Sequence, residues 1–296
     1  MNTREQLAAK AQLVPFWWHS IDLGHGVITD GLKTSAQLEN ELRDIRLPDL
    51  KGKTVLDIGA YDGFFSFEAE RRGASRVVAL DHFVWELEID KCLEYWRECK
   101  KRGIDPDPNA QVNRMHPNEL PGMLAYKTAH EALHSKVETV VADFMATDLS
   151  QLGTFDVVLF LGVLYHLQNP VEALKRLASV TRELAIIETE AMVVPNQEDH
   201  ALCEFFEGCE LNSDWSNWWA PNEKAVVGMC RAAGFRRVEV LHGAPSQSQV
   251  GVAGKSFYLK ARHSIGHVLR EFQLRPPLEI KPTEIIRYRA IVHAWN

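Results

Sequence analysis

Cysteine is scarce in this sequence, and the few cysteines that it has form no recognisable site. The chain has 296 residues and five cysteines, no two of which stand in a Cys-x-x-Cys pair. This scatter disfavours both a zinc site and a framework of disulfides. We therefore predict no metal site, and a chain without disulfides fits the reducing cytoplasm best.

Long apolar runs are also missing. No stretch of about 18 apolar residues occurs, which argues against a membrane-spanning helix. The first six residues lead into no apolar core with a cleavage site, so we predict no signal peptide. The composition, 46% hydrophobic and 25% charged, is ordinary for a globular protein. We expect one large domain with additions, as a monomer or a homodimer.

Positive charge is in short supply. The chain has 33 Lys and Arg against 40 Asp and Glu, a formal net charge of -7. Surfaces that bind nucleic acid usually carry an excess of positive charge. The short basic clusters at residues 71–72 and 100–102 are typical of solvated helix faces. This balance makes tRNA a possible but less favoured partner.

Apolar runs and helical patterns alternate along most of the chain. Strands are predicted at residues 54–58, 76–80, 137–141, 155–161, 184–188 and 238–241. Helices are predicted at residues 63–72, 86–102, 124–134, 170–180 and 222–233. Strands separated by helices, several of them continuously apolar, indicate an α/β fold with a buried parallel sheet covered on both faces.

Several segments do not belong to this alternation. Residues 1–50 are predicted to form an amino-terminal extension, with helices at 3–13 and 35–45, that folds over the site as a lid. Insertions are expected at about 83–136, 189–220 and 245–285, because connections of such length are usually functional or lid-like. Two further strands are predicted near the carboxyl end, at residues 257–260 and 287–292.

A glycine-containing turn follows the first predicted strand. The pattern Asp57-x-Gly59-x-x-x-Gly63 connects that strand to a helix. Gly59 allows a sharp turn and lets the backbone approach a ligand without a side chain in between. Ligands of open parallel sheets bind at the carboxyl ends of the strands, where this turn lies. We therefore predict a nucleotide-type cofactor site here.

Acidic and polar residues end the next strands. Asp81 ends the second strand, about 20 residues beyond the turn, where an acid can bind both ribose hydroxyls. Asp143 and Phe144 end the third, where they would meet adenine, and Leu161 ends the fourth. Each acid alone could simply cap the next helix. Because they recur at successive strand ends, we predict that they share one crevice.

The turn also bears on the choice of cofactor. A dinucleotide dehydrogenase is the main rival, and it would have Gly-x-Gly-x-x-Gly to accommodate a pyrophosphate. Here Tyr61 and Asp62 occupy the place of the second glycine and its neighbour. We expect Asp62 to repel a pyrophosphate, whereas acids suit the positive charges of S-adenosylmethionine.

These motifs together resemble the class I S-adenosylmethionine-dependent methyltransferase superfamily. The closer resemblance is to the family of the bacterial tRNA wobble-uridine carboxymethyltransferase. It rests on the turn, on Leu80 with Asp81, and on the segments 155–158, 162–167, 169–170, 219–222, 233–235 and 289–294. The resemblance implies a Rossmann-like, doubly wound, seven-stranded sheet whose last strand is antiparallel. It identifies residues 51–296 as the methyltransferase domain, with the insertions named above.

The resemblance also implies a set of cofactor-binding residues. It places Gly59 and Ala60 at the methionine part and Asp81 at the ribose. The full predicted set is Asp57, Gly59, Ala60, Gly63, Asp81, His82, Asp143, Phe144, Leu161 and Tyr165. In the carboxymethyl enzyme, a tyrosine and an arginine matching Tyr165 and Arg289 hold the cofactor's extra carboxylate. Residues 16–19 lack the lysine-bearing segment expected there, so ordinary S-adenosylmethionine is predicted.

Candidate catalytic residues follow from the chemistry of methyl transfer, which needs a positioned acceptor and removal of its proton. His166, just past the fourth strand, is the first candidate for the base, since imidazole titrates near neutral pH. His19 and Glu188 are the others, and each could instead be structural. Candidate acceptor-binding residues are Trp18, Asp22, Trp218, Asn222 and Arg289.

The favoured function is O-methylation of a small molecule, either a sugar or a secondary metabolite. Oxygen is favoured because the chain lacks the Asn-Pro-Pro-Tyr motif of amino-group methylation and a cysteine nucleophile motif. Three alternatives stay open at this point. They are a tRNA-modifying transferase, a non-catalytic S-adenosylmethionine-binding module and a dehydrogenase.

Overall fold

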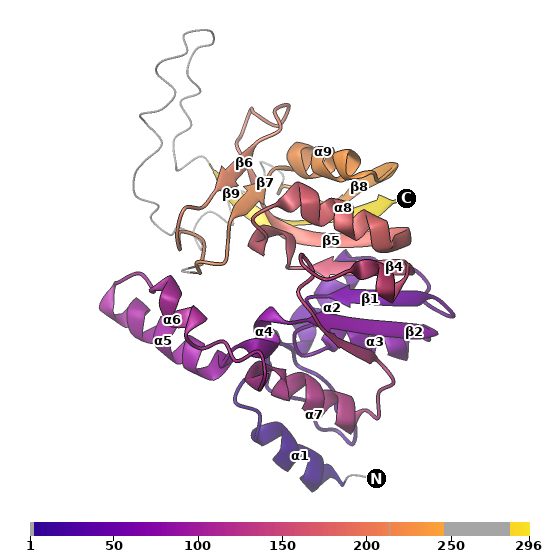
Figure 1. Ribbon diagram of the computed structural model, residues 1–296, viewed down its shortest axis with the longest axis vertical. Coiled ribbons are helices and arrows are strands. Elements are labelled where there is room, and N and C mark those ends of the chain that lie inside the picture. Colours follow the sequence, from indigo (N-terminus) through magenta and orange to yellow (C-terminus); the bar gives the residue numbers. More distant parts are fainter. Residues whose placement is uncertain (1–2, 213, 246–284) are drawn as a thin grey trace.

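Seven strands form one mixed sheet at the centre of the molecule (Figure 1). The computed structural model describes residues 3–212, 214–245 and 285–296. The sheet order is β3-β2-β1-β4-β5-β9-β8, and β9 runs antiparallel to both of its neighbours. The pairs formed by β1 to β5 are parallel. This order confirms the predicted α/β fold and its reversed last strand.

The predicted elements are found with small shifts at their ends. The strands of the sheet are β1 (Thr54–Ile58), β2 (Arg76–Asp81), β3 (Glu138–Val141), β4 (Phe155–Leu161), β5 (Thr181–Val193), β8 (Arg237–His242) and β9 (Ile286–Trp295). The α-helices are α1 (Arg4–Gln12), α2 (Ser35–Asp44), α3 (Phe64–Arg71), α4 (Phe83–Glu86), α5 (Ile89–Arg102), α6 (Pro108–Val112), α7 (Leu124–Ala132), α8 (Pro170–Val180) and α9 (Glu223–Ala233). The predicted strand at 257–260 and nearly all of the predicted insertion at 245–285 lie outside the described residues.

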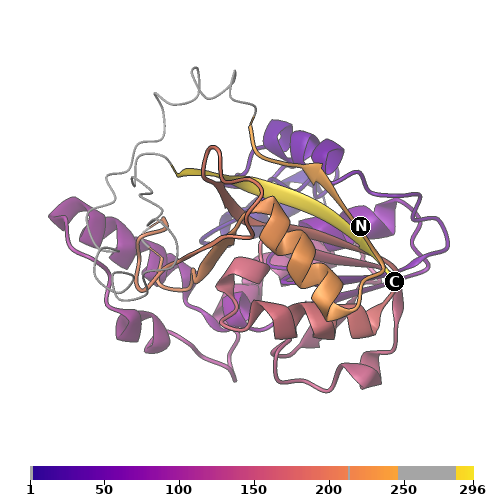
Figure 2. The same cartoon turned by 90° about the horizontal axis from the view of Figure 1, so that it is seen from above.

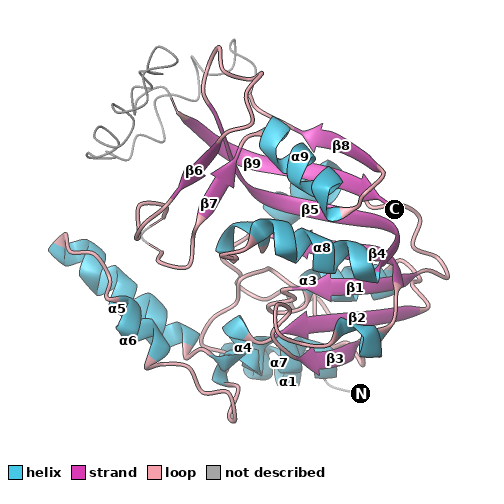
Figure 3. Cartoon of the chain, turned by 45° about the horizontal axis from the view of Figure 1, so that its top comes forward, coloured by secondary structure: helices cyan, strands magenta, loops and turns pink. Residues whose placement is uncertain are grey.

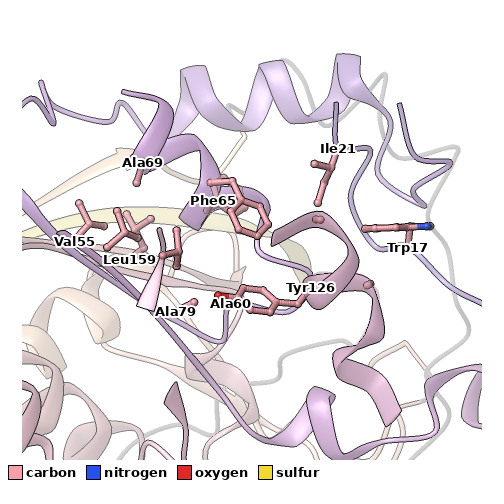
Figure 4. Packing of buried hydrophobic residues seen from close by; sticks show 14 of the residues in the cluster. Trp17, Ile21, Val55, Ala60, Phe65, Ala69, Ala79, Tyr126 and Leu159 are labelled. Carbon is pink, nitrogen blue, oxygen red and sulfur yellow. The ribbon is translucent and has the colours of Figure 1, made fainter. Parts of the chain in front are cut away.

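Each face of the sheet has its own hydrophobic core. In β1, Val55 packs on one side, and Leu56 and Ile58 pack on the other, as strand alternation requires. The first core includes buried side chains of α3, α7 and the amino-terminal extension, as Figure 4 shows for Phe65, Tyr126 and others. The second contains the buried sides of α8 and α9. Figure 2 shows α9 on one face of the sheet and α2 on the other.

Strand β5 is much longer than the five residues predicted. It pairs with β9 from Leu184–Trp295 to Val193–Ile286, so its second half extends beyond β4. A hairpin of β6 (Cys203–Phe205) and β7 (Trp219–Pro221), which was not predicted, lies against this extension. Its small third core includes Met192, Val194 and Ala220. The long strand is stabilised by the distant β9, which a local pattern does not reveal.

Two arms project beyond the carboxyl ends of β1 and β2 (Figure 3). One arm is the insertion after β2. The helix predicted at 86–102 is found there as α5, preceded by the short α4 and followed by α6. The other arm is the β6–β7 hairpin with its connecting loop. The arms meet where the indole of Trp215 donates to the carbonyl of Pro106. Among the described residues, no helix has the length and apolar character needed to cross a membrane.

Candidate functional site

The turn after β1 has the geometry that glycine permits. Gly59 has a φ of +79°, and a Cβ at this position would lie 2.6 Å from Cγ2 of Val163. Gly63 has a φ of +87° and precedes α3, where a Cβ would lie 2.5 Å from the ring of Phe67. A side chain at either position would therefore both strain the backbone and collide with its surroundings.

Asp57, on β1, is bonded to the helix that follows the turn. It is buried, and its Oδ2 accepts a hydrogen bond of 2.6 Å from the hydroxyl of Ser66 on α3. Burial raises the pKa of Asp57 to about 6, although the bond from Ser66 works in the opposite direction. Asp57 was predicted among the cofactor-binding residues. Its position makes it a support that joins β1 to α3.

Asp81 joins the turn to the end of β2. Its two oxygens accept from the backbone N–H groups of Tyr61, at 2.9 Å, and Val84, at 3.4 Å. Burial raises the pKa of Asp81, and these two bonds lower it. A carboxylate oxygen accepts two hydrogen bonds, so each oxygen keeps one acceptor position for a ligand. Asp81 therefore holds the turn in place, and its binding of ribose hydroxyls stays a prediction.

Asp62 has a different role from the one predicted. Its side chain is fully buried and accepts from the backbone N–H groups of Trp18 and His19 and from Nδ1 of His19. The expectation that its charge faces a ligand and repels a pyrophosphate is wrong, since the amino-terminal extension covers it. Asp62 instead fastens that extension to the glycine turn.

The fastened extension lies directly on the turn, and its role as a lid over the site stays a prediction. The rings of Trp18 and Tyr61 are stacked, with centroids 5.5 Å apart. His19 is 5% exposed and packs against Phe64 and Phe65. An imidazole so enclosed is poorly placed to take a proton from an acceptor, which corrects the prediction of His19 as a base. Its bonds to Asp62 instead help to fasten the extension to the glycine turn.

The end of β3 is only partly as predicted. Asp143 is half-exposed, and its Oδ1 accepts a 2.7 Å bond from the backbone of Met145 and lies 3.7 Å from Nε2 of His82. The ring of Phe144 is 5% exposed and packs against Phe160 in the second core. The ring therefore belongs to the core and offers no face to adenine, whereas Asp143 and His82 stay accessible.

A partly buried charge cluster lies beyond β4, on the side of β5 and β9. Arg289 on β9 donates a 3.0 Å bond to the hydroxyl of Tyr165 in the short helix η3 (Leu164–His166). Its Nε lies 3.2 Å from Oε1 of Glu188 and 3.4 Å from Oε1 of Glu190. Leu161, the last residue of β4, is partly exposed beside Gly162. The predicted residues Tyr165, Glu188 and Arg289 are thus brought together.

The charges of this cluster largely compensate one another. Burial raises the pKa of both glutamates, and Arg289 opposes that effect. Burial works to lower the pKa of Arg289, but the two carboxylates and Tyr165 raise it overall. Burial also raises the pKa of Tyr165 to about 12, so its hydroxyl is protonated at neutral pH. The positive charge of Arg289 is therefore already matched by carboxylates of the chain itself.

His166 follows Tyr165 in the same short helix. Its ring packs on that of Tyr165, with centroids 4.1 Å apart. Nδ1 lies 3.1 Å from the carbonyl oxygen and 2.8 Å from the hydroxyl of Ser216, in the connection between β6 and β7. In the part of the chain that the structure describes, Nδ1 is bonded and Nε2 has no hydrogen-bond partner, and the residue as a whole is partly buried. Burial lowers the pKa of His166, against the influence of Asp214.

Three predicted acceptor-binding residues have contrasting positions. Trp218 lies near Phe205 and Tyr165, and its backbone donates to the Tyr165 carbonyl at 2.8 Å. Asn222 is buried, and its amide is bonded to the backbone of Ala225, Leu202 and His200. Asn222 therefore caps α9, and its prediction as an acceptor-binding residue is corrected.

Asp22 lies in an exposed turn, where its Oδ1 accepts from the backbone of Gly24 at 2.9 Å. This bond is a local one of the kind that stabilises turns. Nothing in its surroundings brings Asp22 to the carboxyl ends of the strands, so its predicted role in binding the acceptor finds no support.

Several residues of the site were not predicted individually. Glu190 and Glu188 both lie beside Arg289. Ser216 contacts His166 directly, and Asp214 is joined to His166 through Ser216. The available signal was the acidic character of the second insertion, since the 41 residues from Glu183 to Glu223 contain ten acids and no Lys or Arg. In the described ranges, no group of three or more His, Cys, Asp or Glu is arranged to hold a metal ion.

Comparison with known protein families agrees with this strand order and this glycine turn. A family model described as a methyltransferase domain matches residues 33–240. This chain belongs to that methyltransferase family. The matched region of the methyltransferase includes the turn, Asp81, Tyr165 and His166. The predicted class of enzyme is thus confirmed, and a dehydrogenase is no longer considered.

Sequence relatives of this methyltransferase include tRNA U34 carboxymethyltransferases. The protein of Helicobacter pylori (strain G27) is 26% identical over 192 residues, which are 65% of this chain and 59% of the relative. That of Cellvibrio japonicus (strain Ueda107) is 24% identical over 255 residues, 84% of this chain and 65% of the relative. The matches thus span less than two thirds of the relatives' length.

A solved structure has the same fold. The amino-terminal domain of EvdMO1, solved with SAH bound, has a TM-score of 0.55 and 16% identity. The match covers 100% of this chain and 98% of that one. At this identity the comparison concerns the fold alone, and it confirms the Rossmann-like methyltransferase architecture.

Proposed function

We propose that this chain is an S-adenosylmethionine-dependent methyltransferase that acts on a hydroxyl group of a small molecule, either a sugar or a secondary metabolite. The observation that carries the choice of acceptor is charge. The β6–β7 arm and the adjoining half of β5 belong to the 41-residue stretch of ten acids without Lys or Arg. Four of these acids pair with Lys53, Arg287 and Arg289, and the negative charge of the others disfavours a phosphate backbone and suits a polyhydroxylated or cationic acceptor.

The residues at the strand ends fit S-adenosylmethionine. Asp81 keeps acceptor positions for ribose hydroxyls, and the narrow turn at Gly59 brings backbone close to a ligand. Acidic groups, including Asp143 and Glu188, suit a cofactor that has positive charges and no phosphate. When bound, this cofactor supplies an electrophilic methyl group on sulfur.

The chain's own part in the reaction is to bind, orient and deprotonate the acceptor. Nε2 of His166 would take the proton of the acceptor hydroxyl and hold it. The bound cofactor would supply the methyl group that replaces this proton on the acceptor oxygen and would leave as S-adenosylhomocysteine. Trp218 and its aromatic neighbours form the side of the crevice on which a ring or sugar face can stack.

The Arg289 cluster supports the ordinary cofactor over a carboxylated one. An extra carboxylate would need a positive charge that is free to receive it. Here Glu188 and Glu190 both lie within 3.4 Å of the Arg289 guanidinium, so the cluster has no net positive charge to offer. A third carboxylate at this point would be repelled.

A second candidate function is carboxymethyl transfer to tRNA. The observation that favours it is the name shared by the sequence relatives, tRNA U34 carboxymethyltransferase. The third alternative, a non-catalytic module that only binds the cofactor, is disfavoured because His166, a group able to accept a proton, lies next to Tyr165 and the Arg289 cluster.

The deciding experiment offers the protein isotopically labelled S-adenosylmethionine together with either a pool of small metabolites or total tRNA. Mass spectrometry then identifies the labelled product. We expect label in a small hydroxylated metabolite and none in tRNA. Label in tRNA alone would overturn the small-molecule proposal, and label in neither pool, despite cofactor binding by calorimetry, would support the binding module.

A further inference from the structure

His166 is held by a chain of two further residues from the second insertion. Its Nδ1 lies 2.8 Å from the hydroxyl of Ser216, and that hydroxyl donates a 2.7 Å bond to Oδ1 of Asp214. The backbone N–H of Ser216 donates to the same oxygen at 2.9 Å. The three residues therefore form a continuous series, His166–Ser216–Asp214, that ends on a carboxylate.

This series determines which imidazole nitrogen carries the proton. The carbonyl oxygen of Ser216, 3.1 Å from Nδ1, can only accept, so Nδ1 must be the donor. Because the Ser216 hydroxyl gives its own proton to Asp214, it also presents a lone pair to Nδ1. Both contacts favour the Nδ1–H tautomer, which leaves the lone pair on Nε2, the nitrogen without a partner among the described residues.

We infer that Ser216 and Asp214 are positioning residues that hold His166 in the Nδ1–H tautomer with Nε2 ready to accept the acceptor's proton. This inference rests on the proposed function, because it names the groups that prepare the base of that reaction. In this inference neither Ser216 nor Asp214 contacts the acceptor, and each acts through the imidazole of His166.

A second turn in the same chain has the same two Asp–Ser bonds but no bonded histidine in the described part of the chain, and it serves as a comparison. Asp148 and Ser150 make the same two bonds as Asp214 and Ser216, from the serine backbone at 3.1 Å and from its hydroxyl at 2.7 Å. That exposed turn has no histidine bonded to it among the described residues. The Asp-x-Ser turn is thus a local motif, and only the one at 214–216 is joined to an imidazole.

The charged groups around His166 have opposite effects. Asp214 raises the pKa of the imidazole, while burial and Arg289 lower it. Tyr165, whose ring packs on His166, is protonated at neutral pH. The negative charge of Asp214 therefore partly restores the basicity that burial and Arg289 remove.

The tautomer can be measured without knowing the acceptor. We suggest long-range proton–nitrogen NMR of the full chain labelled with nitrogen-15 histidine, in which the signal lost in His166→Asn is that of His166 among the 12 histidines. We expect the Nδ1–H form in the wild type at pH 8. Ser216→Ala keeps the carbonyl but removes the hydroxyl, one of the two acceptors of Nδ1, so it should show a minor Nε2–H population beside the Nδ1–H form. Ser216→Thr, which keeps the hydroxyl, should restore the wild-type signal.

Kinetics and matched controls complete the test. With the acceptor from the labelling experiment, we expect Ser216→Ala and Asp214→Asn to lower kcat about tenfold with little change in KM. Ser150→Ala and Asp148→Asn should change neither tautomer nor kcat. An Nε2–H form of His166 in the wild type would overturn the inference, as would an unchanged tautomer and kcat in both test variants.

Failure of the proposed function would look different. It would appear as label in tRNA alone, or as absence of S-adenosylhomocysteine binding to the wild type by calorimetry. The NMR signal of His166 does not depend on that binding, so the two results can be told apart.

Discussion

The glycine turn and the acceptor side lie at the same edge of the sheet, yet their polar groups are used in different ways. At the turn, Asp57 and Asp62 are buried and bonded to the chain itself. On the acceptor side, Nε2 of His166 has no partner in the described part of the chain, and Arg289 is balanced by carboxylates within a partly open cluster. The comparison indicates that the cofactor half is rigidly preorganised, whereas the acceptor half keeps groups available for chemistry.

Removal of the base should give the largest effect and would test the chemical role of the acceptor side. We expect His166→Asn to lower kcat about 10²–10⁴-fold, the usual range for a general base, while S-adenosylhomocysteine binding stays unchanged. In the wild type, the acid limb of kcat/KM should have its midpoint below 6.5, because the pKa of His166 is lowered. Comparable losses of binding and of kcat would show that His166 is structural.

Asp62→Ala tests how strongly the extension is fastened to the turn. The change leaves two backbone N–H groups and Nδ1 of His19 without their acceptor. Since each buried unsatisfied group costs about 1–3 kcal/mol, we expect a loss of about 3 kcal/mol or more in the free energy of unfolding. Urea denaturation measures it, with Asp22→Ala in an exposed turn of the same extension as the control. A loss no larger than the control's would mean that the extension is not fastened by Asp62.

Asp81→Ala tests the cofactor half directly. We expect about 100-fold weaker binding of S-adenosylhomocysteine by calorimetry, because hydrogen bonds to a charged group contribute about 1.5–3 kcal/mol. Asp143→Ala should weaken binding less, since Asp143 is half-exposed. Unchanged affinity in the folded Asp81→Ala protein would contradict the assignment of the site.

Asp57→Asn tests the smallest effect, a pH dependence of stability. The folded-state pKa of about 6 lies above the ordinary 3.8, so the folded state binds the proton more tightly. Stability should therefore rise as the pH falls through 6 toward 3.8, and the burial of the charge costs most above pH 6. Between pH 7.5 and 5 we expect roughly 1–2 kcal/mol of stabilisation in the wild type that the variant lacks. If the unfolding free energies of the two proteins changed with pH in the same way, Asp57 would not be the cause of the pH dependence.

Much of the fold follows from local patterns. Five elements lie within one or two residues of their predicted bounds, namely β1, β2, β4, α3 and α8. Apolar runs and helix-start signals, such as the N-cap Gly63 and Pro170 in the first turn, act locally. The length of β5 and the β6–β7 hairpin did not follow, since both depend on pairing with partners far along the chain.

For the site, the sequence by itself determined which residues stand at the strand ends, since parallel strands bring their carboxyl ends to one edge. Asp81, Tyr165 and the glycine turn thereby lie at one edge of the sheet, whereas Glu188, predicted at a strand end, lies within the longer β5 opposite Leu161. Only the tertiary structure decided which of these groups stay available. The direction of Asp62 toward the extension, the burial of the Phe144 ring and the link from His166 to Asp214 all depend on contacts between distant segments. Such contacts leave no local period or motif in the chain, because a side chain's partners are chosen by packing in three dimensions.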